Sequence, residues 1–97
     1  MNELKYIIVT PNGFNKVMGA RAIIFNGFFT HADMVPPRCK VESAGFCTIE
    51  KNGHSIATCY GNSESLKVES DPLFDSIIIT RTLSKMHPRI GYIETEY

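Results

Sequence analysis

The sequence lacks the features that mark several large classes of protein. It has no tryptophan, and ten basic side chains are balanced by ten acidic ones, which argues against a protein whose main task is coating nucleic acid. It has no run of about 18 apolar residues, so we expect no membrane span. The apolar stretch at residues 6–9 is much shorter than a secretory signal, and we expect none.

Cysteine is scarce and unpatterned. Cys39, Cys47 and Cys59 form no C-x-x-C pair. An odd number of thiols without a secretory signal predicts reduced cysteines, and therefore a cytoplasmic protein. The spacing of His31, Asp33 and His54 matches no zinc pattern, so we expect neither a metal nor another cofactor.

What is present is an ordinary globular composition. The chain has 97 residues, of which 43% are apolar and 21% charged. This length supports one hydrophobic core, so we expect a single domain over residues 1–97. Residues 1–48 carry five basic and three acidic side chains, and residues 49–97 carry five and seven.

Runs of β-branched and aromatic residues dominate the first half. Residues 4–10 and 21–25 are predicted strands, ended by Pro11-Asn12-Gly13 and Asn26-Gly27. Residues 28–35 are predicted to continue as an extended segment up to Pro36-Pro37. The secondary structure of residues 14–20 is left unassigned by their sequence. The six phenylalanines are expected mainly in the core.

Asn52-Gly53 lies between two β-type runs, 40–51 and 54–60, and favours a two-residue hairpin turn. That turn would place Ile49 opposite Ile56 and Phe46 opposite Cys59. Cys47 and Cys59 would then point to opposite faces, which argues against a disulfide between them. Both faces of the hairpin are partly apolar, so we expect both to be covered, by a helix or by another subunit.

Ser70-Asp71-Pro72 is the clearest helix start, because Ser70 can cap and proline suits the first turn. Acidic residues near the start and basic residues near the end agree with the helix dipole. The β-branched run at 77–80 favours a strand instead, but the caps favour a helix over about 71–84. One broad face of this helix is predicted to carry Leu73, Phe74, Ile77, Ile78 and Arg81. Residues 65–68 could form a short strand, and residues 90–97 an edge strand or a free tail.

These elements predict an α+β fold, in which one C-terminal helix packs against a curved antiparallel β-sheet.

The first candidate site is Thr30-His31-Ala32-Asp33. In a strand, His31 and Asp33 would project from the same side, and a hydrogen bond between them would make a base and its orienting acid. With Cys59 they would supply the parts of a small hydrolase. The alternative is a polar pair that closes a loop before Pro36-Pro37.

The second candidate is the loop that follows the hairpin. It offers an amide, two hydroxyls and a carboxylate within four residues, which suits a polar ligand, but the same side chains also make ordinary turn hydrogen bonds. Basic side chains also lie among the aromatic residues of the first half, namely Arg21, Arg38 and Lys40. Such interleaving is typical of nucleic-acid-binding surfaces, so contact with a nucleotide or a nucleic acid stays an alternative. The expected ligand-binding residues are His31, Asp33, Tyr60, Asn62, Ser63, Ser65 and Arg21.

Four short segments carry a resemblance to known proteins. They are Thr30-His31-Ala32-Asp33, Ala44-Gly45-Phe46, Tyr60-Gly61-Asn62-Ser63-Glu64-Ser65-Leu66, and Ser70-Asp71-Pro72 with Asp75. Through these segments, residues from about 20 to 83 resemble a family of small uncharacterised proteins encoded in bacteriophages and prophages. The resemblance implies a genomic setting in which small accessory proteins bind a host defence protein, or its signalling nucleotide, stoichiometrically.

The leading hypothesis is therefore a non-enzymatic, homo-oligomeric binding protein of phage type in the bacterial cytoplasm. It would inhibit a host defence system by sequestering a protein component or a small signalling nucleotide. One alternative is a small hydrolase or nuclease that uses His31 and Asp33. The other is a nucleic-acid-binding module that uses Arg21, Arg38 and Lys40.

Overall fold

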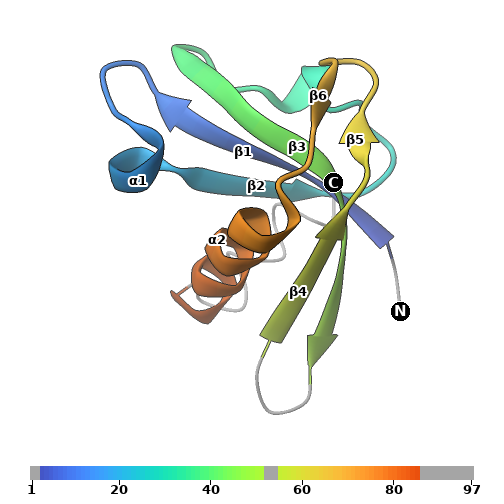
Figure 1. The fold of residues 1–97 in the computed structure, drawn as a ribbon. Coiled ribbons are helices and arrows are strands. Elements are labelled where there is room, and N and C mark those ends of the chain that lie inside the picture. Colours follow the sequence, from blue (N-terminus) through green and yellow to red (C-terminus); the bar gives the residue numbers. More distant parts are fainter. Residues whose placement is uncertain (1–2, 52–54, 86–97) are drawn as a thin grey trace.

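The computed structural model describes residues 3–51 and 55–85 (Figure 1). Its helices are α1 (Lys16–Gly19), a 3₁₀ helix at Ala32–Met34, and α2 (Pro72–Lys85). Its strands are β1 (Glu3–Pro11), β2 (Arg21–Phe25), β3 (Cys39–Lys51), β4 (Ser55–Tyr60), β5 (Asn62–Ser63) and β6 (Val68–Glu69).

The main sheet has the strand order β2-β1-β3-β4, and every neighbouring pair is antiparallel. α2 packs against this sheet and contacts both β2 and β4 (Figure 1). The predicted α+β fold with a C-terminal helix is confirmed. Among residues 3–51 and 55–85, no helix has the length and apolar character needed to cross a membrane.

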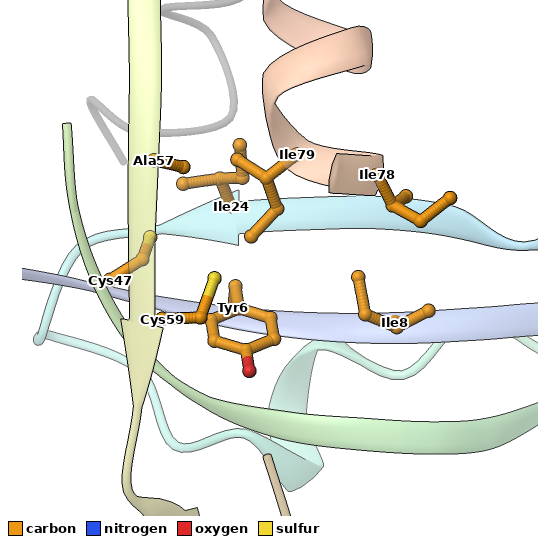
Figure 2. Packing of buried hydrophobic residues seen from close by; sticks show 8 residues of the cluster. All are labelled: Tyr6, Ile8, Ile24, Cys47, Ala57, Cys59, Ile78 and Ile79. Carbon is orange, nitrogen blue, oxygen red and sulfur yellow. The ribbon is translucent and has the colours of Figure 1, made fainter. Parts of the chain in front are cut away.

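The core lies on both faces of the sheet. On one face, Ile78 and Ile79 of α2 pack over side chains from all four strands, including Tyr6, Ile24 and Cys47 (Figure 2). On the other face, Ile7, Val9, Phe25 and Ala44 form a second cluster. This second cluster is covered by the segment between β2 and β3 and by Leu66 and Val68 near the small β5-β6 hairpin. The middle of β1 is therefore buried on both faces, which explains why residues 6–9 form a continuous apolar run instead of alternating with polar residues.

The register of the β3-β4 hairpin differs by one residue from the prediction. Cys47 pairs with Cys59, and Phe46 pairs with Tyr60. The predicted turn at residues 52–54 lies outside the described residues. A one-residue change moves every side chain of one strand to the opposite face, and here it places both thiols and Ala57 on the face that α2 covers. Core packing therefore determines this register, and the prediction that Cys47 and Cys59 face opposite ways is wrong.

The two facing cysteines are buried and free (Figure 2). Burial raises the pKa of the Cys47 thiol to about 12 and also raises the pKa of Cys59. Thiolate is the reactive form, so at neutral pH these side chains act as small apolar groups of the core. The buried, protonated thiol of Cys59 does not suit the hydrolase hypothesis, in which Cys59 would be the nucleophile.

α2 spans the predicted residues but presents a different face to the sheet. Phe74, Asp75, Ile78 and Ile79 face inward, whereas Leu73 is 77% exposed. Ile77 is also half exposed, at 49%. The prediction that Leu73, Phe74, Ile77 and Ile78 share one face with Arg81 is thus wrong, because only Phe74 and Ile78 face the sheet and Asp75 lies between them in the interior. The helix begins at Pro72, so Asp71 rather than Ser70 lies at its N-cap.

Several loops also differ from the predictions. Residues 28–35 do not continue as an extended strand but contain turns and the 3₁₀ helix. The expected strand at 65–68 is limited to the short β6, and residues 14–20 contain the four-residue α1. Phe14 and Phe28 are exposed rather than in the core. Residues 90–97 lie outside the described residues.

Candidate functional site

The structure brings two candidate loops, about 30 residues apart in sequence, into contact. The backbone N–H of Ala32 donates a hydrogen bond of 3.2 Å to Ser65 Oγ, and Ser65 Oγ lies 3.4 Å from Ser63 Oγ. Both loops lie on the sheet face opposite α2, beside the cluster around Phe25. We call this meeting point of residues 28–33 and 62–65 the loop junction.

His31 is the buried anchor of the loop junction. Its Nε2 lies 2.8 Å from the carbonyl oxygen of Gly45, and because a carbonyl can only accept, Nε2 carries the proton. The imidazole also meets the rings of Phe25 and Phe46 edge to face, each at 5.6 Å between centroids. A ring held this way by β2 and β3 fixes the loop on the sheet, and burial lowers its pKa.

We expect the free energy of unfolding to fall as the pH drops below about 6.5, the ordinary histidine pKa. Above that pH, folded and unfolded chains both hold a neutral His31. Below it, the unfolded chain takes up a proton that the folded chain resists, because the folded-state pKa is lowered. The contribution is limited to about 1.4 kcal/mol per pH unit for one proton. Urea denaturation between pH 5 and 8 measures it.

The matched variant is His31→Gln, which cannot titrate. It is expected to be less stable than the wild type at pH 8 but to show a shallower decline toward pH 5. Other ionisable groups contribute equally to both proteins, so the difference in slope isolates His31. Parallel slopes would contradict a lowered His31 pKa.

Asp33 does not orient His31. Its Oδ2 accepts a hydrogen bond of 3.1 Å from the N–H of Thr30, and its own N–H donates to Thr30 Oγ1 at 3.2 Å. Hydrogen bonding to the Thr30 hydroxyl and to the Thr30 N–H lowers the pKa of the Asp33 carboxyl, so an ionised carboxylate lies on the exposed surface. The predicted His31–Asp33 pair is wrong because this segment is a helical turn rather than a strand.

The remaining loop residues divide into internal and exposed groups. Ser63 is buried, and its Oγ accepts from the N–H of Leu66, so it holds the turn in shape. Asn62 is exposed opposite Glu69 in the small hairpin. Tyr60 stacks on Phe46, at 6.2 Å between centroids.

The basic side chains do not form one patch. Arg21 pairs with Val9, and Lys40 pairs with the next residue of β1, Thr10. Because successive side chains of a strand point to opposite faces, Arg21 and Lys40 lie on opposite sides of the sheet. Lys40 Nζ also lies 3.4 Å from a carboxylate oxygen of Glu42. Arg21 shares the sheet face of Val9 and the loop junction but lies at the opposite end of β2 from Phe25, whereas Lys40 lies on the other face. The two side chains form no common basic surface, which weakens the nucleic-acid alternative.

One polar cluster was missed by the sequence reasoning. The fully buried carboxylate of Asp75 accepts hydrogen bonds from the hydroxyls of Tyr6 at 2.5 Å and Ser43 at 2.6 Å. Its Oδ2 also accepts from the N–H of Asp71 at 2.8 Å. Burial raises the pKa of Tyr6, so this phenol remains a donor. The only sequence signal was a tyrosine inside an apolar run, and the cluster serves to hold α2 on the sheet.

Within residues 3–51 and 55–85, no group of three or more His, Cys, Asp or Glu side chains is placed to hold a metal ion. Models of known protein families give no match to this chain, and neither curated proteins nor solved structures give one. The interpretation of the site therefore depends on its own geometry.

Proposed function

We propose that this protein acts by stoichiometric binding of a protein partner at the loop junction. The observation that carries the proposal is the contact between Ala32 and Ser65, which joins two exposed loops into one surface. We call that surface the platform. It consists of Phe28, Thr30, Asp33, Asn62, Glu64 and Ser65, all of which are exposed.

Phe28 is the natural anchor of the platform. Its side chain is 89% exposed, and exposed aromatic side chains are characteristic of the residues that dominate protein interfaces. The loop that presents it is held in shape, because the N–H of Phe28 donates to Asn26 Oδ1 at 2.9 Å. Lys5 Nζ also donates to the carbonyl of Phe29 at 2.9 Å. A loop ordered before binding loses less entropy on association.

The charge of the platform favours a protein over a nucleotide. Asp33 and Glu64 place two carboxylates on it, and Glu69 lies opposite Asn62. The basic side chains nearby are Lys67 in the same loop and Lys5, whose Nζ is bonded to the Phe29 carbonyl. An anionic signalling nucleotide would be repelled by this surface, whereas basic side chains on a protein would be attracted. We therefore propose that the partner presents Lys or Arg around an apolar pocket for Phe28.

The phage resemblance supplies a setting for this activity. In that setting the protein would inhibit a host defence system by occupying one of its protein components. The hydrolase alternative needs an accessible His31, but this ring is buried and bonded to Gly45. Sequestration needs no accessible histidine, so it suits a His31 ring that is buried and anchored to β3.

The test compares three baits in affinity capture from bacterial lysate, followed by calorimetric titration of the purified partner. The baits are wild type, Phe28→Ala, and Phe14→Ala as the matched control, since Phe14 is exposed in a different loop. We expect Phe28→Ala to weaken binding by about 30-fold or more, and Phe14→Ala to leave it unchanged. A fixed stoichiometric ratio is also expected.

Charge reversal separates the two classes of ligand. Glu64→Lys is expected to weaken the binding of a basic protein partner. Raising the salt concentration should slow the association of that partner with the wild type. Saturable binding of a cyclic dinucleotide that Glu64→Lys strengthens would contradict the proposal and favour the nucleotide.

A further inference from the structure

Cys47 and Cys59 are two thiols that the fold places directly opposite each other. They come from neighbouring antiparallel strands, since Cys47 of β3 pairs with Cys59 of β4. Both side chains belong to the core beneath α2, beside Tyr6 (Figure 2). The one-residue difference from the register that the sequence favours therefore brings the two thiols to the same face.

The hydrogen bonds of β4 show which kind of strand pair the two cysteines form. β4 is an edge strand beside β3, and the N–H of Ala57 donates to Thr80 Oγ1 of α2 at 3.2 Å, so this N–H points away from β3. Ile49 and Ala57 therefore form a non-hydrogen-bonded pair. Because the two kinds of pair alternate along an antiparallel ladder, Cys47 and Cys59, two residues further along, form a non-hydrogen-bonded pair as well.

A pair of this kind has the separation that a disulfide requires. The Cα atoms of a non-hydrogen-bonded pair lie about 4.5 Å apart, and their side chains are closer than in a hydrogen-bonded pair. The Cα atoms of disulfide-bonded cysteines are usually separated by roughly 4.4–6.8 Å. The backbones of β3 and β4 are thus already close enough for a bond between the sulfur atoms of Cys47 and Cys59.

Cys39 is too far away to compete within the same chain. It lies at the start of β3 and pairs with Pro11, whereas Cys47 pairs with Leu4 near the other end of β1. The stretch of strand from Cys39 to Cys47 covers roughly 25 Å, because a strand rises about 3.3 Å per residue. A disulfide cannot span this distance, so Cys47 and Cys59 are the pair that can react.

We propose that Cys47 and Cys59 are a redox modification site, which hydrogen peroxide oxidises to a disulfide between β3 and β4. The Cys59 sulfur attacks one peroxide oxygen, the O–O bond breaks, and a sulfenic acid forms as hydroxide leaves. The Cys47 sulfur then attacks the Cys59 sulfur, and the S–O bond breaks. The proton of the Cys59 thiol goes to the hydroxide and that of Cys47 to the departing hydroxyl, so the peroxide becomes two molecules of water.

The surroundings of the two thiols decide which of them reacts first. Burial raises the pKa of both, but at Cys59 a hydrogen bond with Ser76 of α2 opposes this rise. Cys59 also lies on the edge strand and is 4% exposed, whereas Cys47 is fully buried. Cys59 is therefore the attacking thiol and Cys47 the resolving one. Because the thiolate is the nucleophile, burial makes the reaction slow, and the pair stays reduced until peroxide is abundant.

The disulfide ties an edge strand to the rest of the sheet. β4 ends at Tyr60, directly before residues 62–65 of the loop junction. A bond between Cys47 and Cys59 restricts the unfolded chain and so stabilises the β3-β4 hairpin that leads to this loop. Oxidation is thus expected to make the protein harder to unfold.

Mass spectrometry of the full chain tests the proposal. Cys39→Ser leaves the pair as the only thiols. The folded protein is treated with excess hydrogen peroxide, freed of peroxide, unfolded and alkylated with iodoacetamide. We expect it to lose the mass of two hydrogen atoms and to take up no alkyl group, and dithiothreitol should restore both alkylation sites. A digest of the oxidised wild type without reductant should contain the peptides of Cys47 and Cys59 joined to each other.

The matched control is Cys47→Ala in the same Cys39→Ser background. Its single thiol, Cys59, is expected to gain oxygen or to remain open to alkylation, with no loss of two hydrogen atoms. The thermal midpoint of the oxidised Cys39→Ser protein should rise by about 5 °C or more, and that of the control should not.

Two alkylated cysteines after peroxide treatment of Cys39→Ser would overturn the proposal, as would oxygen added at Cys59 while Cys47 stays free. A disulfide that leaves the thermal midpoint unchanged would overturn the stabilisation of the hairpin. Phe28→Ala should oxidise as the wild type does, so failure here is distinguishable from failure at the platform.

Discussion

Replacing Asp75 by alanine is expected to lower the free energy of unfolding by about 3 to 5 kcal/mol, the largest effect of any single substitution considered. The carboxylate is fully buried and accepts from Tyr6, Ser43 and the N–H of Asp71. Alanine leaves two buried hydroxyls and the part-buried N–H of Asp71 without their acceptor, and it opens a cavity between α2 and the sheet. Urea denaturation followed by circular dichroism measures the loss.

A graded series identifies the cause. Asp75→Asn keeps the shape, and its remaining oxygen still accepts from Tyr6 and Asp71 while its amide donates to Ser43, so about 1 to 2 kcal/mol is expected. Tyr6→Phe removes one donor from the buried carboxylate and is expected to cost about 1 to 3 kcal/mol. Ile77→Ala, on the outer face of the same helix, is the control, with about 1 kcal/mol or less. A cost for Asp75→Ala near that of the control would contradict the anchoring role.

Replacing Gly45 by alanine is expected to cost about 2 to 4 kcal/mol, because there is no space for a methyl group. A Cβ there would lie 2.5 Å from the carbonyl oxygen of Tyr60 and 3.2 Å from Ser70 Cβ. Both are firmly placed: Tyr60 is in β4, and the N–H of Ser70 donates to the carbonyl of Gly61. The chain entering α2 would have to move away from β3.

Gly27→Ala is the matched control for this substitution. A Cβ at Gly27 would meet nothing within 4 Å, so thermal unfolding should be nearly unchanged. Gly45→Ala is also expected to disturb the loop junction, since the Gly45 carbonyl binds His31. An alanine variant as stable as the wild type would show that β3 and β4 can separate at this point without loss.

The candidate site was only partly predictable. Sequence patterns singled out residues 30–33 and 60–65, because hydroxyls, carboxylates and an amide lie close together there. They did not indicate that Ala32 and Ser65 would touch, since such a contact depends on how both loops cover the second core face. Nor did they distinguish the buried His31 from the exposed Asp33. The burial of His31 depends on the rings of Phe25 and Phe46, which belong to two different strands.

By itself, the sequence determined the local elements with strong signals. The strands at 4–10 and 21–25 and the helix that begins at Pro72 all form as expected, because strand propensity, proline and charge act over a few residues. Tertiary structure alone decided the register of β3 with β4 and the rotation of α2. Asn52-Gly53 favoured one register, but burial of Cys47, Ala57 and Cys59 beneath α2 favoured the other. Likewise Leu73 and Ile77 are apolar enough to be buried, yet the hydrogen bonds of Asp75 to two distant strands turn them outward, and no local pattern records such partners.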